Sequence, residues 1–153
     1  MKALASFLVA SAIRRYVLMV GMNLLPLSTL RIILLRLSGV RIGSGCYIGF
    51  NLSVDTNYPE LISIGDNVTI SHNCVIIAHT QSPVRSPLSS IYCDQKAVHI
   101  ANGAWIAMNC ILLPGSSVGE NCFIGAGSIV TSQMPACFLC AGNPCKPLKQ
   151  LFQ

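Results

Sequence analysis

Three histidines are the side chains of this sequence best suited to acid–base chemistry near neutral pH, because an unperturbed imidazole has a pKa of about 6.5. His79 ends an aliphatic run and precedes a loop rich in proline and serine, residues 81–97. A long insertion in a compact chain is more often functional than incidental. This setting makes His79 the strongest candidate for a functional histidine, although its position alone would also suit an ordinary loop residue. His72 and His99 lack such a setting and are expected to be surface or subunit-contact residues.

Eight cysteines could form disulfides or hold a metal, so their spacing matters. Four of them fall where a six-residue repeat wants a small hydrophobic side chain: Cys46, Cys74, Cys110 and Cys122. A CxxC with a third thiol nearby follows at Cys137, Cys140 and Cys145, but no fourth ligand has the spacing of a zinc site. We expect free structural thiols, no bound metal and a reducing compartment.

The elements that position these side chains follow from a period of six. Helices and strands have side-chain periods of about 3.6 and 2, so neither explains this repeat. It is typical of a parallel β-helix, in which each coil buries one flank against the next. The repeat begins at Ile42, shifts phase at an insertion over residues 55–61, and gives out after Val130. Between residues 98 and 131 the repeating aliphatic residues are Ile100, Ile106, Leu112, Val118, Ile124 and Val130.

We expect one domain from the 153 residues, with three segments. Residues 1–40 form an apolar, basic helical segment, residues 41–135 form the β-helix with its inserted loop at 81–97, and residues 136–153 form a C-terminal tail. The composition agrees, because a solenoid core needs apolar residues at every turn and the chain is 52% hydrophobic and only 10% charged.

The N-terminal segment carries most of the positive charge. Six of the ten lysines and arginines, and none of the acidic residues, lie in residues 1–41. The arginines leave no uninterrupted apolar stretch of about 20 residues, the length of a membrane-spanning helix. The segment is expected to lie in a membrane interface, to cap the open end of the β-helix, or both. The rest of the chain is close to neutral, which argues against a nucleic-acid partner.

Over residues 40–150 the sequence resembles the left-handed β-helix hexapeptide-repeat acyltransferases, in particular the sugar O-acetyltransferases that include the galactoside and maltose enzymes. The resemblance implies an all-β fold with a left-handed parallel β-helix. The matching strings, in the order and spacing of that family, are Ala104-Trp105-Ile106, Leu113-Pro114-Gly115, the run from Ile124 to Thr131, and the run from Ala141 to Lys146.

Members of this family are homotrimers whose active sites lie between subunits, with acetyl-CoA laid along the groove between two β-helices. By the resemblance, His79 matches the general base, and Asn51 matches a residue that contacts the acceptor. Asp55 matches a nearby acidic position and is likewise expected to bind the substrate. The residues that match CoA contacts are Trp105, Ala107, Met108, Ala126, Thr131, Ser132, Lys146 and Lys149. The chain departs from the family at Ala107, a common glycine, and at Ser132, a common lysine.

The sequence thus predicts a trimeric, acetyl-CoA-dependent O-acetyltransferase that acts on a sugar or polysaccharide-precursor hydroxyl by direct transfer. We expect it in the cytoplasm, with peripheral contact to the inner face of the membrane through residues 1–40. Two alternatives remain. A zinc enzyme like the γ-class carbonic anhydrases needs three histidines, two of them close in the chain, and that pair is missing here. The fold could also serve as a non-enzymatic assembly platform.

Overall fold

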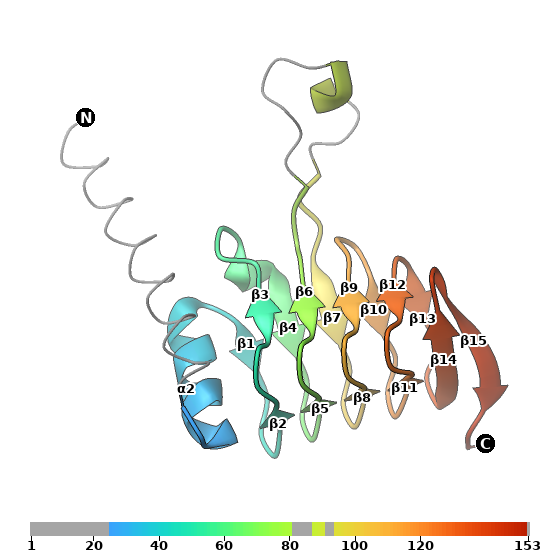
Figure 1. Cartoon of the computed structure of the whole chain (residues 1–153), viewed down its shortest axis with the longest axis horizontal. Helices are drawn as coiled ribbons and strands as arrows, with labels where there is room; N and C mark the ends of the chain where they lie inside the picture. Colours follow the sequence, from blue (N-terminus) through green and yellow to red (C-terminus); the bar gives the residue numbers. More distant parts are fainter. Residues whose placement is uncertain (1–24, 81–86, 91–93, 153) are drawn as a thin grey trace.

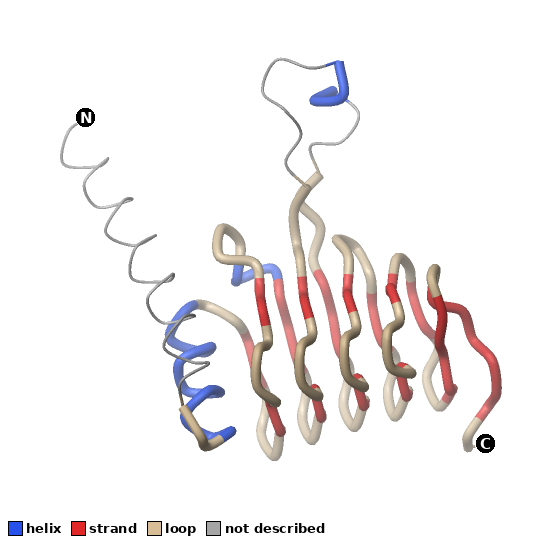
Figure 2. Tube along the Cα trace, viewed as in Figure 1, coloured by secondary structure: helices blue, strands red, loops and turns tan. Residues whose placement is uncertain are grey.

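The computed structural model describes residues 25–80, 87–90 and 94–152, and these form a parallel β-helix (Figure 1). Short strands alternate with corners around each coil (Figure 2). Sheet A consists of β1 (Arg41–Ile42), β4 (Ile62–Ile64), β7 (Val98–Ile100), β10 (Ser117–Val118) and β13 (Gln133–Met134). Sheet B consists of β2 (Tyr47–Ile48), β5 (Thr69–Ile70), β8 (Trp105–Ile106), β11 (Phe123–Ile124), β14 (Phe138–Gly142) and β15 (Cys145–Gln150). Sheet C consists of β3 (Ser53–Val54), β6 (Val75–Ile76), β9 (Ile111–Leu112) and β12 (Ile129–Val130).

The aliphatic residues of the six-residue repeat form the core, as predicted. In sheet B the parallel register places Ile48, Ile70, Ile106 and Ile124 above one another, each with no exposed surface. Sheets A and C contribute equivalent columns, so the coils up to Val130 direct one aliphatic residue inward from each of their three sides. Because neighbouring strands lie about 4.8 Å apart, each inner side chain packs directly on those of the adjacent coils.

The corners between sheets need left-handed backbone. At the corner between sheets B and C, Asn51, Asn73 and Asn109 have φ values of 55°, 61° and 60°. Asparagine tolerates this conformation better than most residues. At the corner between sheets A and B, Gly103 leaves space for the Asn121 side chain of the next coil, because a Cβ there would collide with the amide oxygen.

Helix α2 (Ser28–Ser38) covers the N-terminal end of the β-helix. Arg31 is 1% exposed, and its Nε and Nη2 donate to the Ile48 carbonyl at 3.0 and 2.7 Å. Its guanidinium lies 4.3 Å from the centre of the Phe50 ring. Arg36 donates to the Ile42 and Gly43 carbonyls. The described part of the basic segment therefore caps the first coil by bonding carbonyls that no strand among the described residues pairs.

Fewer basic residues of the N-terminal segment are available for membrane contact than the sequence indicated. Arg31 and Arg36 are committed to the cap, and residues 1–24 lie outside the described part of the chain. Among the helices that the structure describes, none is both long enough and apolar enough to cross a bilayer.

The C-terminal segment, expected to be a tail, contains a β-hairpin. β14 continues sheet B on β11, and β15 turns back antiparallel to it. Met134 and Cys140 take the inward places above Val118 and Ile124, so the repeat continues past Val130 without an Ile, Leu or Val in those places. Because methionine and cysteine occupy these positions, the six-residue pattern of isoleucine, leucine and valine ends in the sequence before the β-helix ends in the structure.

The cysteines in the described residues are free thiols. Cys74, Cys110 and Cys122 are buried, as expected of small hydrophobic side chains in the repeat. Burial raises the pKa of Cys122 to about 12 and that of Cys145 to about 11, which keeps both thiols protonated and poorly reactive at neutral pH.

Candidate active site

Both interruptions of the repeat begin at the same end of sheet C. The insertion over residues 55–61 follows β3, and His79 and the long loop follow β6. Val54 and Ile76 are register partners in these strands, and the Asp55 N–H donates to the Ile76 carbonyl at 2.9 Å. The parallel register therefore brings the two interruptions together although 24 residues separate Asp55 from His79.

His79 is held by the carboxylate of Asp55. Its Nδ1 bonds Asp55 Oδ2, and the two side chains are 20% and 0% exposed. Asp55 Oδ2 also accepts the Ala78 N–H at 3.0 Å, whereas Oδ1 accepts the N–H groups of Asn57 and Tyr58 at 2.9 and 3.2 Å. With Nδ1 engaged, Nε2 is the ring nitrogen that remains for proton transfer.

The pKa of Asp55 reflects two opposing influences. Burial by itself would raise the pKa of this carboxyl, but the hydrogen bonds from His79, Ala78, Tyr58 and Asn57 lower it below its ordinary value. Asp55 is therefore ionised at neutral pH. A buried anion bonded to Nδ1 fixes the orientation of the imidazole ring.

Residues from both interruptions also surround the His79 side chain. The Tyr58 ring meets His79 edge-on at 5.2 Å between centroids, and the Tyr58 hydroxyl accepts a 2.6 Å hydrogen bond from Gln95 Nε2. Gln95 lies at the base of the long loop and pairs with His79 in an antiparallel bridge. Asn57 places its amide nitrogen 3.4 Å from His79 Nε2. An open hollow of about 270 Å³ then runs from His79 along the outer side of β3 and β6.

Asp55 does not have the exposure that contact with an acceptor would need. Its side chain is fully buried and both oxygens are bonded within the protein, so the structure gives it the role of positioning His79. Sequence reasoning missed this pairing, and it missed Asn57, Tyr58 and Gln95 altogether. The phase shift over residues 55–61 was the available signal, but sequence alone did not connect it to His79.

Asn51 lies at the other end of β3. The four residue steps from Asn51 to Asp55 could span at most about 13 Å if fully extended, and they cross sheet C from one corner to the next. Asn51 Nδ2 donates to Asn73 Oδ1 at 3.0 Å, within the asparagine ladder of the corner. Within one chain, the structure does not bring Asn51 to His79.

The predicted CoA residues fall into separate groups. Ala107, Met108 and Ala126 occupy the corner between sheets B and C, after β8 and β11. Thr131 and Ser132 follow β12 at the corner between sheets C and A, the side on which His79 lies. The width of sheet C therefore separates the two groups in a single chain.

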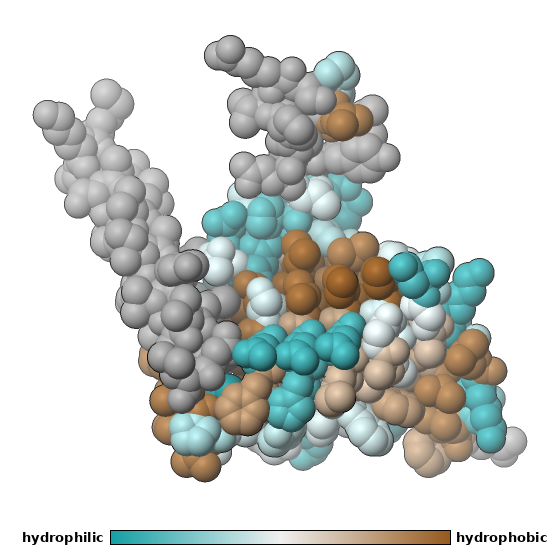
Figure 3. Space-filling model, viewed as in Figure 1, coloured by the Kyte–Doolittle hydropathy of each residue, from teal (hydrophilic) through white to brown (hydrophobic). Residues whose placement is uncertain are grey.

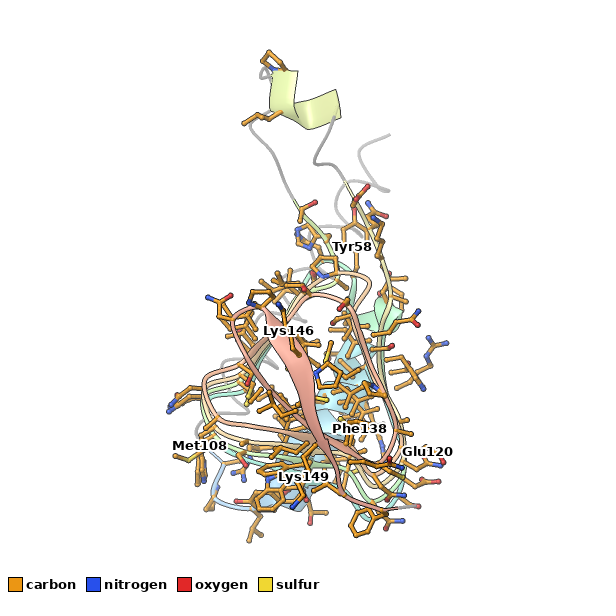
Figure 4. All side chains as sticks on the ribbon, turned by 90° about the vertical axis from the view of Figure 1, so that its right-hand side faces the viewer. Tyr58, Met108, Glu120, Phe138, Lys146 and Lys149 are labelled. Atoms are coloured by element: carbon orange, nitrogen blue, oxygen red, sulfur yellow. The ribbon has the colours of Figure 1, made fainter. Side chains whose placement is uncertain are left out.

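Three further predicted CoA residues lie on sheet B. Trp105 is 50% exposed on its outer face and stacks on Phe123 with centroids 4.5 Å apart. Lys146 and Lys149 are exposed on β15, which crosses the C-terminal end of the coil (Figure 4). In the same view Met108 projects from a different corner of the coil.

The other two histidines have local partners. His72 Nδ1 accepts the Phe50 N–H at 2.9 Å and its ring stacks on Phe50, while His99 Nδ1 lies 2.8 Å from the Ser63 hydroxyl. No set of three or more His, Cys, Asp or Glu side chains in the described residues could hold a metal ion.

Two family models match the repeat. The bacterial transferase hexapeptide (six repeats) matches residues 97–132, and the hexapeptide repeat of succinyl-transferase matches residues 39–78. Galactoside O-acetyltransferase of Escherichia coli (strain K12) is 36% identical over 117 residues, which cover 74% of this chain and 55% of that protein. The chain thus spans only about half the length of the curated relatives it matches, at 55% and 50%.

Solved structures share the fold. A hexapeptide-repeat containing acetyltransferase of Vibrio cholerae O1 biovar eltor, complexed with acetyl coenzyme A, has a TM-score of 0.78 at 21% identity and covers 94% of this chain and 88% of its own. A maltose O-acetyltransferase of Clostridium difficile 630 has a TM-score of 0.65 at 25% identity, with coverages of 96% and 89%. With its left-handed β-helix, its two repeat matches and its sugar O-acetyltransferase relatives, the chain belongs to the hexapeptide-repeat acyltransferases.

Proposed function

We propose that this protein transfers an acetyl group from acetyl-CoA to a hydroxyl of a sugar or polysaccharide precursor, with His79 as general base. The observation that carries the proposal is the histidine held by a buried carboxylate where both interruptions of the repeat meet. The similarity to a galactoside and a maltose O-acetyltransferase supports the acyl donor and the class of acceptor.

The chemistry needs one base and no covalent enzyme intermediate. Nε2 of His79 takes the hydroxyl proton while the acceptor oxygen attacks the thioester carbonyl. The tetrahedral intermediate collapses by breaking the carbon–sulfur bond, and the leaving thiolate recovers the proton from the imidazolium. The products are an acetyl ester and CoA with a free thiol. Asp55 stabilises the imidazolium between these steps, and a positioned base of this kind is typically worth about 10²–10⁴ in rate.

The active assembly is a homotrimer in this proposal, with acetyl-CoA held between copies. Support comes from the outer side of sheet C, where Val75, Ile111 and Ile129 are half-buried aliphatic residues in register. Figure 3 shows this hydrophobic patch over β6, β9 and β12. Packing sheet C against a second copy would bring the corner that carries Met108 beside the corner of the partner that follows β12. Such packing would unite the two groups of predicted CoA residues.

We also propose that the protein works in the cytoplasm at the inner face of the membrane, through its N-terminal segment. Lys2, Arg14 and Arg15 lie in an apolar sequence, and Leu27 and Ile33 near and on α2 are 60% and 45% exposed. Co-sedimentation of the full chain with anionic liposomes tests this. Replacing Arg14 and Arg15 with alanine is expected to reduce binding, and equal binding to zwitterionic liposomes would argue against an electrostatic contact.

The activity itself is tested with acetyl-CoA and a panel of sugars and nucleotide sugars, by following release of the free thiol. We expect thiol release that depends on one class of acceptor and an acetyl ester in the product. Thiol release that is independent of every acceptor would contradict the proposal. Stoichiometric zinc in the purified protein would instead favour the three-histidine alternative.

A further inference from the structure

Helix α2 has a second apolar face besides the one that caps the β-helix. Arg31, Ile32 and Leu35 face the first coil and are buried. Leu30 and Ile33, on the opposite side of the helix, are 39% and 45% exposed. Because residues three apart lie on one face of a helix, these two form an apolar stripe that faces away from the β-helix.

The candidate active site lies at the same end of the molecule as this stripe (Figure 1). Helix α2 bonds the carbonyls of Ile42 and Ile48 in the first coil. Asp55 follows β3 of that coil, His79 follows β6 of the second, and the hollow beside His79 is lined by residues of these two coils. From the coil spacing and the diameter of a helix, His79 lies about 20 Å from the outer surface of α2 along the axis of the β-helix.

The sequence that precedes α2 indicates what the stripe contacts. Residues 1–24 are largely apolar and carry Lys2, Arg14 and Arg15 but no acidic residue. Apolar side chains together with cations fit the interface of an anionic membrane, where the cations bind lipid phosphates and the apolar groups reach the acyl chains. The stripe on α2 extends this apolar surface to the end of the β-helix that carries the hollow.

We propose that the outer face of α2 lies on an anionic membrane, so that the β-helix stands on its N-terminal end and acetylates sugars that are anchored to lipid in the same membrane. The acceptor class is then an amphiphile, a sugar joined to a lipid. A cyclic trimer with its axis along the β-helices would turn all three α2 helices to this end and strengthen the contact through multivalency. The inference rests on the proposed acetyl transfer and deepens it, because it names how the acceptor reaches His79.

The test presents one sugar to the full chain in two forms. The best sugar of the panel is supplied free in solution, or coupled to a phospholipid in vesicles of phosphatidylcholine and phosphatidylglycerol. At equal sugar concentration we expect thiol release to be about 10-fold faster or more with the coupled sugar, because binding to the vesicle raises the local concentration of acceptor.

Ile33→Asp should lose this gain and keep the wild-type rate on the free sugar, since the substitution places a carboxylate against anionic lipids. Leu148→Asp is the matched control, because Leu148 is 63% exposed on β15 at the C-terminal end of the β-helix, and it should behave as wild type on both forms. Leu30→Asp, on the same stripe, is the second variant if Ile33→Asp loses its activity on the free sugar through misfolding.

The outcomes separate this inference from the activity on which it rests. Equal wild-type rates on the two forms would overturn the membrane presentation and leave the acetyltransferase standing. A gain that Ile33→Asp retains, or that Leu148→Asp loses equally, would also overturn it, since the contact would not lie at α2. The same holds if plain vesicles speed the reaction of the free sugar by the same factor, because lipid would then activate the enzyme and not present the acceptor. If wild type acetylates neither form, both proposals fall.

Discussion

Sheets A and C have the same inner face and opposite outer faces. Inside, both present stacked apolar residues, nearly all of them isoleucine, leucine or valine and most of them fully buried. Outside, sheet C presents Ser53 on its first strand and then aliphatic side chains in register, Val75, Ile111 and Ile129. The outward residues of sheet A, in the order of its strands, are all polar: Arg41, Ser63, His99, Ser117 and Gln133.

The difference separates what makes the fold from what makes the function. A single chain gains no stability from leaving aliphatic side chains half-exposed, so the outer column of sheet C indicates a surface that another molecule covers. His79 lies at the end of that sheet, whereas His99 lies in the middle of the polar one. The inner columns can be the same in every coil because they only stack, while the outer columns and the interruptions differ from sheet to sheet.

The largest expected effect compares the two histidines. His79→Asn removes the base and should lower kcat by about 10²–10⁴, because asparagine cannot take the proton. His99→Asn should leave turnover within about twofold of wild type, since its partner is a surface serine. Steady-state kinetics with unchanged circular dichroism checks both. Equal losses in the two variants would contradict the assignment.

The second comparison tests whether the inner faces are equivalent. Leu112→Ala in sheet C and Ile100→Ala in sheet A each empty a fully buried site, and each should cost about 2–5 kcal/mol of unfolding free energy in urea titrations. Ser117→Ala, on the outer face of sheet A, should change it by less than about 0.5 kcal/mol. A loss of unfolding free energy well below about 2 kcal/mol at either site would mean that the inner face of that sheet is not part of the core.

The third comparison tests the outer faces on neighbouring strands. Ile111→Asp places a charge in the aliphatic column of sheet C and should convert the proposed trimer into monomers, because burying an unpaired carboxylate is unfavourable. Ser117→Asp makes the same chemical change on sheet A and should leave the trimer intact. Light scattering after size-exclusion chromatography gives both masses. Dissociation by Ser117→Asp alone would assign the interface to sheet A instead.

The smallest expected effect is a pH dependence. The folded pKa of Asp55 lies below its ordinary value, so the unfolded chain binds more protons in acid. The stabilisation is therefore present above about pH 4 and is lost as the pH falls through the folded pKa. Asp55→Asn lacks this contribution, and its deficit in melting temperature relative to wild type should shrink on acidification. A deficit that stays constant between neutral and acid pH would show that the ionised form is not what stabilises the fold.

The sequence predicted the coil because its period is local and regular. The interruptions that mark His79 were visible for the same reason, as departures from that period. The Asp55–His79 pairing was not visible, because it depends on the register of β3 against β6 across 24 residues. The role of Arg31 was hidden too, since a basic residue in an apolar segment gave no sign that it would be buried against carbonyls.

The cap on the first coil also decides how copies can assemble. Strand edges that are left open recruit further strands, which is a route to fibrils. Here Ile42 and Ile48, on the first strands of sheets A and B, direct their carbonyls to guanidinium groups, which donate hydrogen bonds but cannot extend a sheet. Extension of sheets A and B by a further strand is therefore opposed at this edge of the β-helix.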